Sequence, residues 1–187
     1  MKLIKYLMGF IILALFLYQI PMYSKNNDTL SSNSKKNISL EHAYVSVAYS
    51  KIFLPNDGSF DKNLGSSGNN FFGATFGPFV FISENFCISS DIGILLGNIN
   101  GIFAWKLYFI PSLNLWIGHL NVGFGSGVSN MYLKNDNSKY GGLGSASELF
   151  ANVSLTEKIQ IGLKIGYDNY SQVKYNTLSF NLKYIIF

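Results

Sequence analysis

The chain has 187 residues, a length that suits one domain. Only 13% of the residues are charged, against roughly 25% in ordinary soluble domains, whereas 48% are hydrophobic and 16% are aromatic. The net charge is +4, but every basic residue is a lysine, which argues against nucleic acid as a partner because its recognition relies on arginine. The single cysteine excludes an intrachain disulfide and a cysteine-rich metal site.

The N-terminal residues 1–24 have the pattern of a signal peptide. Lys2 and Lys5 precede an apolar stretch from Leu7 to Ile20, and the small Ser24 offers a cleavage point. The alternative is an uncleaved single-span anchor, although a stable span needs about 20 apolar residues. Residues 25–40 are polar and predict a flexible leader, so that 41–187 remains for the folded domain.

The rest of the chain alternates with period two, which is typical of β-strands with two different faces. From Phe103 to Leu115 the odd positions are apolar, whereas the even positions are mixed and include Lys106. A closed sheet whose apolar face points outward requires a lipid bilayer around it. The same alternation predicts eight strands, at about 41–53, 70–82, 86–96, 102–116, 120–130, 143–155, 159–168 and 174–187.

The connections between these strands are predicted to differ in length. Tight turns are expected after the second, fourth and sixth strands, and longer loops after the first, third, fifth and seventh. This asymmetry is typical of outer-membrane barrels, with the short turns on the periplasmic side. Pro78 and Pro111 fall inside strands, where a closed sheet has no free edge, so we expect bulges or early strand ends there.

The mixed faces should line the lumen, and they carry six charged residues. Because buried charge is costly unless it is paired, we expect Asp91 to pair with Lys106, and Glu148 with Lys164. The predicted lumen polar cluster is Asp91, Lys106, Glu148, Lys164, Asp168 and Lys183. The cluster is interpreted as a structural polar plug, with a gated ion path as the alternative.

The C-terminal sequence LSFNLKYIIF is an alternating strand that ends on an aromatic residue. With it, residues 40–187 resemble the small eight-stranded outer-membrane barrels of the OmpA/OmpX-like group. The resemblance implies an all-β fold, an antiparallel up-and-down transmembrane barrel in the bacterial outer membrane. It also implies two partners, outer-membrane lipid and the barrel-insertion machinery, the latter reading an assembly signal formed by Phe180, Leu182, Tyr184 and Phe187.

We expect the function to depend on the surface loops that connect the strands. The segments 54–70 and 131–142 are rich in Asn, Gly, Ser and Asp, as surface loops that contact host or envelope ligands often are. The prediction is a structural or adhesion-like role, and the alternative is a narrow channel or transporter for small solutes. His42 and His119 fall at the periplasmic rim, so we expect no enzyme, no metal site and no cofactor.

Overall fold

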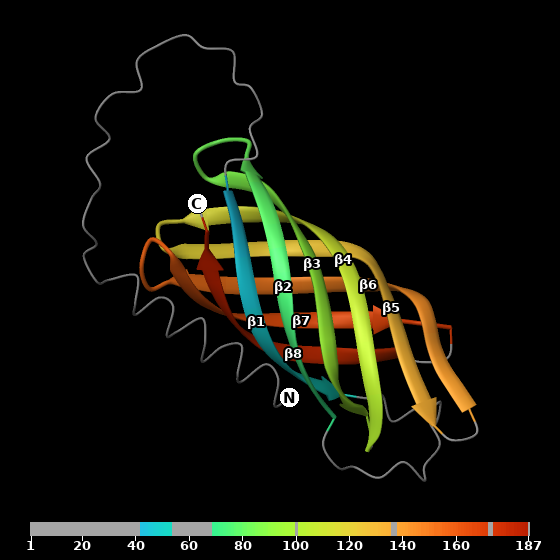
Figure 1. Ribbon diagram of the computed structural model, residues 1–187. Helices are drawn as coiled ribbons and strands as arrows, with labels where there is room; N and C mark the ends of the chain where they lie inside the picture. The colour runs from blue at the N-terminus through green and yellow to red at the C-terminus, as the bar shows by residue number, and fades with distance from the viewer. Residues whose placement is uncertain (1–41, 54–68, 100, 136–137, 172–173, 187) are drawn as a thin grey trace, which may run out of the picture.

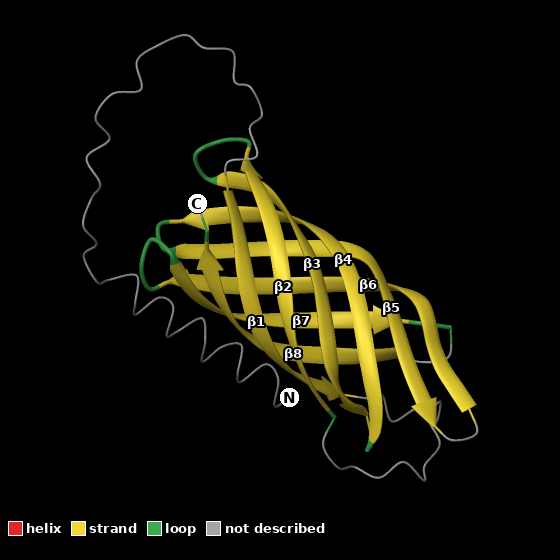
Figure 2. Ribbon diagram, in the orientation of Figure 1, coloured by secondary structure: helices red, strands yellow, loops and turns green. Residues whose placement is uncertain are grey.

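The computed structural model describes residues 42–53, 69–99, 101–135, 138–171 and 174–186, which form a closed antiparallel barrel (Figures 1 and 2). Each strand pairs with the next one in the chain, and the last strand pairs with the first, as the sequence predicts. The strands are β1 (His42–Phe53), β2 (Asn70–Phe81), β3 (Phe86–Ile99), β4 (Ile102–Ile117), β5 (Leu120–Asn135), β6 (Ser138–Ser154), β7 (Ile159–Asn169) and β8 (Lys174–Ile185). In the described residues, no helix is long and apolar enough to cross a membrane.

The two ends of the barrel differ, although not in the way that the sequence predicts. Short turns follow β2, β4 and β6, as predicted, and we call this end the turn end. At the opposite, far end, the predicted long loop after β5 is wrong, because only residues 136–137 separate β5 from β6. After β3 the sequence GNING predicts a short loop at 97–101, and β3 continues to Ile99, so that residues 100–101 separate it from β4. Residues 54–68, which hold most of the first predicted loop, lie outside the described residues.

The second predicted loop, 131–142, is a continuation of the β5–β6 hairpin. Backbone pairing runs through Met131 and Gly142 to Asn135 and Ser138. Pairing between β6 and β7 begins only at Ser145, so the far half of this hairpin extends beyond β7 (Figure 1). The Asn and Gly content of this segment resembles a loop, but backbone pairing does not depend on side-chain type, and the hairpin continues through it.

The side chains alternate between the outer face and the lumen as predicted. On β4, Phe103 is 59% exposed on the outer face, whereas Ala104 and Lys106 are buried inside. The same alternation holds on β3, where Ile92 faces outward and Asp91 is buried. The apolar band therefore lies on the outside of the barrel, which is the reverse of a soluble protein.

The strands are staggered around the barrel. A row of paired residues that begins at His42 on β1 returns to β1 at Ile52, ten residues farther along. Such a stagger tilts the strands by about 35–45° from the barrel axis. Each row of paired residues therefore climbs from the turn end toward the far end as it passes from β1 to β8. The row contains His42, Phe79, Ser89, Ser112, Gly125, Glu148, Gly166, Thr177 and Ile52.

The two prolines lie inside strands without a bulge or an early strand end, so that expectation is wrong. Pro78 remains paired with Ala43 on β1, and Pro111 with Ser90 on β3. On the other side of each proline the pairing is interrupted and then resumes in the same register. The missing donor is thus accommodated by one local gap in a ladder that is otherwise continuous.

Candidate functional site

The lumen brings together the six charged residues that the sequence places on the mixed face. Each of them is at most 9% exposed, and they come from β3, β4, β6, β7 and β8. Three are acidic and three are basic, so the buried charges balance within the barrel. The six are Asp91, Lys106, Glu148, Lys164, Asp168 and Lys183.

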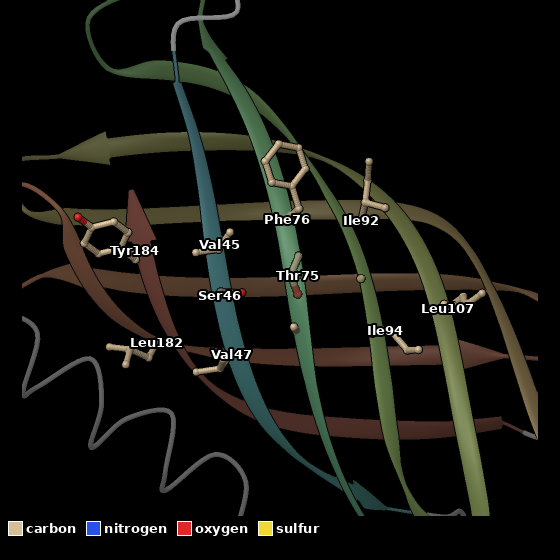
Figure 3. Close-up of a pocket in the computed structure, with 12 residues that line it drawn as sticks. Val45, Ser46, Val47, Thr75, Phe76, Ile92, Ile94, Leu107, Leu182 and Tyr184 are labelled. Carbon is tan, nitrogen blue, oxygen red and sulfur yellow. The ribbon is translucent and has the colours of Figure 1, made fainter. Parts of the chain in front are cut away.

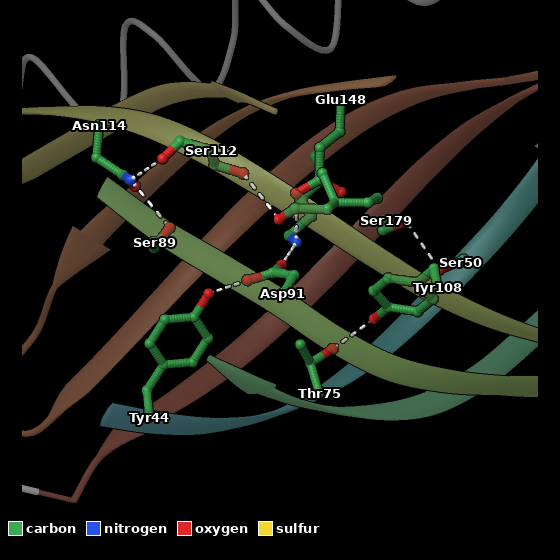
Figure 4. A network of polar contacts seen from close by, with 12 residues as sticks. Tyr44, Ser50, Thr75, Ser89, Asp91, Tyr108, Ser112, Asn114, Glu148 and Ser179 are labelled. Carbon is green, nitrogen blue, oxygen red and sulfur yellow. Dashed lines mark hydrogen bonds and ion pairs between the residues drawn. The ribbon is translucent and has the colours of Figure 1, made fainter. Parts of the chain in front are cut away.

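Lys164 on β7 is the centre of this arrangement. Its Nζ lies 2.9 Å from Oε1 of Glu148 on β6, which is the predicted pair. The two residues are diagonal neighbours, because Glu148 is paired in register with Gly166, and a long side chain spans that offset. Lys164 also forms an ion pair with Asp91 on β3, across the lumen, and Tyr44 of β1 donates a hydrogen bond to Asp91 (Figure 4).

Lys106 has a different partner from the one predicted. Its Nζ lies 2.6 Å from Oδ1 of Asp168 on β7, so the predicted Asp91–Lys106 pair is wrong. The register explains the error, because Asp91 is paired with Ile110, four residues from Lys106 along β4. At about 3.3 Å per residue, roughly 13 Å separates the two positions along the strand. Lys106 instead reaches across the barrel interior.

Lys183 has aromatic neighbours. Among the described residues, no carboxylate lies within 4.0 Å of its Nζ. The ammonium lies 4.2 Å from the ring centroid of Tyr44 and 5.3 Å from that of Phe150. Cation–π contacts of this kind contribute about 2 kcal/mol where water is excluded. The carboxylates of Asp91 and Glu148 form their ion pairs with Lys164 and not with Lys183.

Neutral polar groups fill the space around the charges. The hydroxyls of Thr75 and Tyr108 are hydrogen-bonded, and Ser179 donates to Ser50 at 2.7 Å (Figure 4). Nδ2 of Asn114 donates to Oγ of Ser89 at 2.9 Å. The sequence analysis did not single out Tyr44 or Tyr108, although their parity along β1 and β4 places them on the lumen face.

The far end of the lumen is closed by an apolar cluster that the sequence analysis did not identify. Leu133 and Ile99 are fully buried there, and Tyr175 donates a hydrogen bond to Sδ of Met131 at 3.4 Å. The signal was present as adjacent apolar residues at the strand ends, which cannot all face lipid. The cluster, which we call the far-end cap, is Ile52, Phe71, Leu95, Ile99, Ala104, Met131, Leu133, Tyr170 and Tyr175.

The turn end has a buried group of its own. Tyr44, Phe79 and Cys87 form a small buried cluster, against which Trp116 and Ile185 pack. Between this floor and the far-end cap, a lumen cavity of about 40 Å³ is lined by residues that include Lys106, Glu148 and Lys164. Since a water molecule needs about 10–15 Å³ of such space, the cavity has room for roughly three waters. A smaller cavity of about 20 Å³ lies beside the turn-end cluster, with Lys183 in its lining, and side chains occupy much of the rest of the described lumen.

A shallow concavity of about 590 Å³ lies on the outer wall and spans β8, β1, β2, β3 and β4 (Figure 3). Its rim is apolar, with Phe76 and Ile92 on one side and Leu182 and Tyr184 on another. The small Ala74 forms part of its floor. Because it opens on the outward apolar face, hydrocarbon chains would fill it, and it has no convergent polar groups of the kind that orient a specific ligand.

The remaining predicted residues lie where the alternation puts them. Phe180, Leu182 and Tyr184 face outward on β8 with exposures of 60%, 49% and 46%, whereas Phe187 lies outside the described residues. His42 stacks on Phe79 at 5.2 Å at the turn end, and His119 lies in the turn between β4 and β5. In the part of the chain that the structure describes, no three His, Cys, Asp or Glu residues form a group suited to a metal ion.

Comparison with known proteins identifies the fold and leaves the activity open. No protein-family model and no curated protein sequence matches the chain. Among solved structures, the N-terminal barrel of Pseudomonas aeruginosa OprF is similar with a TM-score of 0.55 at 7% identity, covering 78% of this chain and 97% of that one. The attachment invasion locus protein Ail of Yersinia pestis is similar with a TM-score of 0.54 at 11% identity, covering 78% and 98%. Neisserial surface protein A has a TM-score of 0.51 at 11% identity, covering 80% and 99%.

Proposed function

We propose that this chain, which has the fold of the small outer-membrane barrels, is a bacterial outer-membrane protein with a structural polar plug and a binding surface at its far end. The observation that carries the proposal is a buried apolar cluster at each end of the lumen, with the larger one, the far-end cap, at the far end. The three acidic and three basic side chains in the lumen balance one another. In this proposal the apolar outer wall contacts lipid, and the far end of the barrel binds other molecules.

The plug interpretation is supported by the way the buried charges are satisfied. Lys164 is shared by two carboxylates, and Lys106 and Asp168 form a second ion pair. Paired charges of this kind can remain buried, whereas an unpaired buried charge is strongly destabilising. A conducting path would need water to reach these groups from both ends, and the nine buried apolar residues of the far-end cap argue against access from the far end.

The alternative, a narrow channel, makes a clear prediction. We expect the purified protein in a planar bilayer to show no steady unit conductance, because apolar side chains close the far end of the lumen. A large porin measured in the same bilayers is the positive control for the assay. Reproducible unit conductance of the wild-type protein would contradict the plug and favour the channel.

The far end carries lysines on several strands. Lys51 and Lys174 are exposed at the far ends of β1 and β8. Lys134 and Lys139 occupy directly paired positions near the tip of the β5–β6 hairpin. A structure of Ail has been solved in complex with the heparin analogue sucrose octasulfate, at a TM-score of 0.51 and 13% identity. We propose, in line with both observations, that the far end binds an anionic saccharide.

Substituting the two hairpin lysines tests this role. Lys134→Ser with Lys139→Ser should weaken binding of heparin by roughly tenfold or more, since each lysine near an anionic surface contributes about 1 kcal/mol. Heparin titration of the barrel in nanodiscs at two salt concentrations gives the measurement. Lys158→Ser, in the turn between β6 and β7, is the matched control and should leave affinity unchanged. Equal loss in both variants, or binding that ignores salt, would contradict the proposal.

A further inference from the structure

Buried polar atoms without a hydrogen-bond partner lie in a single row of the lumen. In the described residues, six such side-chain atoms belong to Trp116, Asn121, Asn152 and Asn181. The register joins these residues, because Trp116 on β4 is paired with Asn121 on β5, and Asn121 with Asn152 on β6. Asn152 is in turn paired with Gly162 on β7, whose partner on β8 is Asn181. Buried polar groups of this kind are rare, and each calls for a partner such as a water or an ion.

The first two residues of this row line the cavity of about 20 Å³ at the turn end, which we call the turn-end cavity. Lys183 on β8 and Gln160 on β7, which are paired in register, also line it. Since a water molecule needs about 10–15 Å³ of such space, the cavity has room for one species of that size. No aspartate or glutamate is among the described residues that line it.

Lys183 brings a buried positive charge to this cavity. The residue is 5% exposed, and no carboxylate of the described residues lies within 4.0 Å of its Nζ. The rings of Tyr44 and Phe150 attract the ammonium, but a ring face offers no strong acceptor to its three N–H donors. An anion in the cavity would give Lys183 both a counter-charge and a hydrogen bond.

The neutral groups around the cavity also favour an anion over a cation. The indole Nε1 of Trp116 can only donate a hydrogen bond, and it is one of the buried atoms without a partner. The carboxamide of Asn121 carries both an acceptor and two donors, so rotation of the amide group turns a donor toward the cavity. A cation would instead meet the ammonium of Lys183 and the N–H of Trp116.

We propose that the turn-end cavity binds one small monovalent anion of the size of chloride. Lys183 supplies the charge, and Trp116 and Asn121 supply hydrogen bonds. Because these residues come from β8, β4 and β5, the anion joins strands from different parts of the barrel. Larger anions such as sulfate do not fit the cavity. The inference goes beyond the proposed function and is independent of it, since it concerns the turn end and not the proposed saccharide surface.

Bromide, which quenches tryptophan on contact, is the probe for this site. Trp105→Phe leaves Trp116 as the sole tryptophan, since the chain has two. The folded barrel in detergent micelles is titrated with sodium bromide, while sodium gluconate keeps the ionic strength constant. We expect the fluorescence of Trp116 to fall to a plateau as one site is filled. Chloride at its own dissociation constant should raise the apparent dissociation constant for bromide about twofold by mass action, whereas sulfate should leave it unchanged.

A lysine substitution in the same background locates the site. Lys183→Met should abolish the plateau and leave only quenching that rises linearly with bromide. Lys158→Met, in the turn between β6 and β7 and outside the lining of the cavity, is the matched control and should keep the plateau.

Two results would overturn the inference. Linear quenching of Trp116 without an effect of chloride would show that the cavity takes up water only. A plateau that survives Lys183→Met would place the halide at another site. The chloride competition needs no substitution in the lumen, so it decides the inference even where Lys183→Met does not fold.

Discussion

Lys164→Met is expected to destabilise the folded barrel by about 3–5 kcal/mol, because it leaves two buried carboxylates without their cation. Asp91 and Glu148 both form ion pairs with Lys164, and both are at most 8% exposed. Removing the ammonium leaves like charges close together in a medium of low dielectric constant. We therefore expect the free energy of unfolding, measured by urea titration in vesicles, to fall more for this change than for any other single lysine in the lumen.

Lys183→Met is the matched control, because it removes the same group from the same lumen. The ammonium of Lys183 contacts the rings of Tyr44 and Phe150 and forms no ion pair with the described residues. Its removal should cost about 2 kcal/mol or less, which is the value of a desolvated cation–π contact. If the two variants lose equal stability, the shared ion pairs of Lys164 are not the cause.

A triple variant distinguishes the net contribution of the ion pairs to stability from the cost of leaving two carboxylates unpaired. Replacing Asp91 with Asn, Glu148 with Gln and Lys164 with Met removes all three charges together. Because replacing a whole buried ion-pair group is often close to neutral, this variant should recover most of the stability lost by Lys164→Met alone. Failure to recover would show that the methionine disrupts packing and that the uncompensated charge is not responsible.

Phe124→Lys is expected to cost about 2–4 kcal/mol, the value for a lysine near the middle of a lipid-facing band. Phe124 lies on the outer face of β5 with 50% exposure, between the turn end and the polar Asn130 on the same strand. The cost arises because no water solvates the ammonium at that depth. Refolding into vesicles and mobility on unboiled denaturing gels both report the loss of the folded form.

Asn130→Lys on the same strand is the control for this prediction. Asn130 is outward and exposed, but it lies at the polar limit of the band, where the cost of a lysine falls to about 0–1 kcal/mol. A much larger loss of stability for Phe124→Lys than for Asn130→Lys would show that the membrane-facing band on β5 includes Phe124 and ends near Asn130. Similar, small effects of both substitutions would contradict a membrane around the barrel wall.

The outer face could be predicted from the sequence because alternation is a local property. The parity of Phe103 and Lys106 along β4 determines that they lie on opposite faces, whichever strands lie beside them. The same reasoning placed all six charged residues in the lumen. It also gave the number of strands, since runs of alternation are separated by turn signals, such as the tight turn expected after the second strand.

The far end could not be predicted by the same means. Residues 131–142 contain the Asn and Gly of a typical loop, yet pairing of Leu133 with Tyr140 continues the hairpin. Whether such a segment pairs depends on the partner strand and its register, and neither is a local property. The far-end cap was missed for a related reason, because Ile99 and Leu133 become buried only when distant strands meet inside the closed barrel.

The sequence by itself determined which residues face outward and which face the lumen, because the two faces of a strand follow from residue parity alone. It also determined the Glu148–Lys164 pair, since neighbouring strands joined by a tight turn have little freedom of register. Only the tertiary structure decided that Lys164 meets Asp91 and that Lys106 meets Asp168. Those pairs cross the lumen between strands that are not neighbours, and their heights match only through the stagger of the closed barrel.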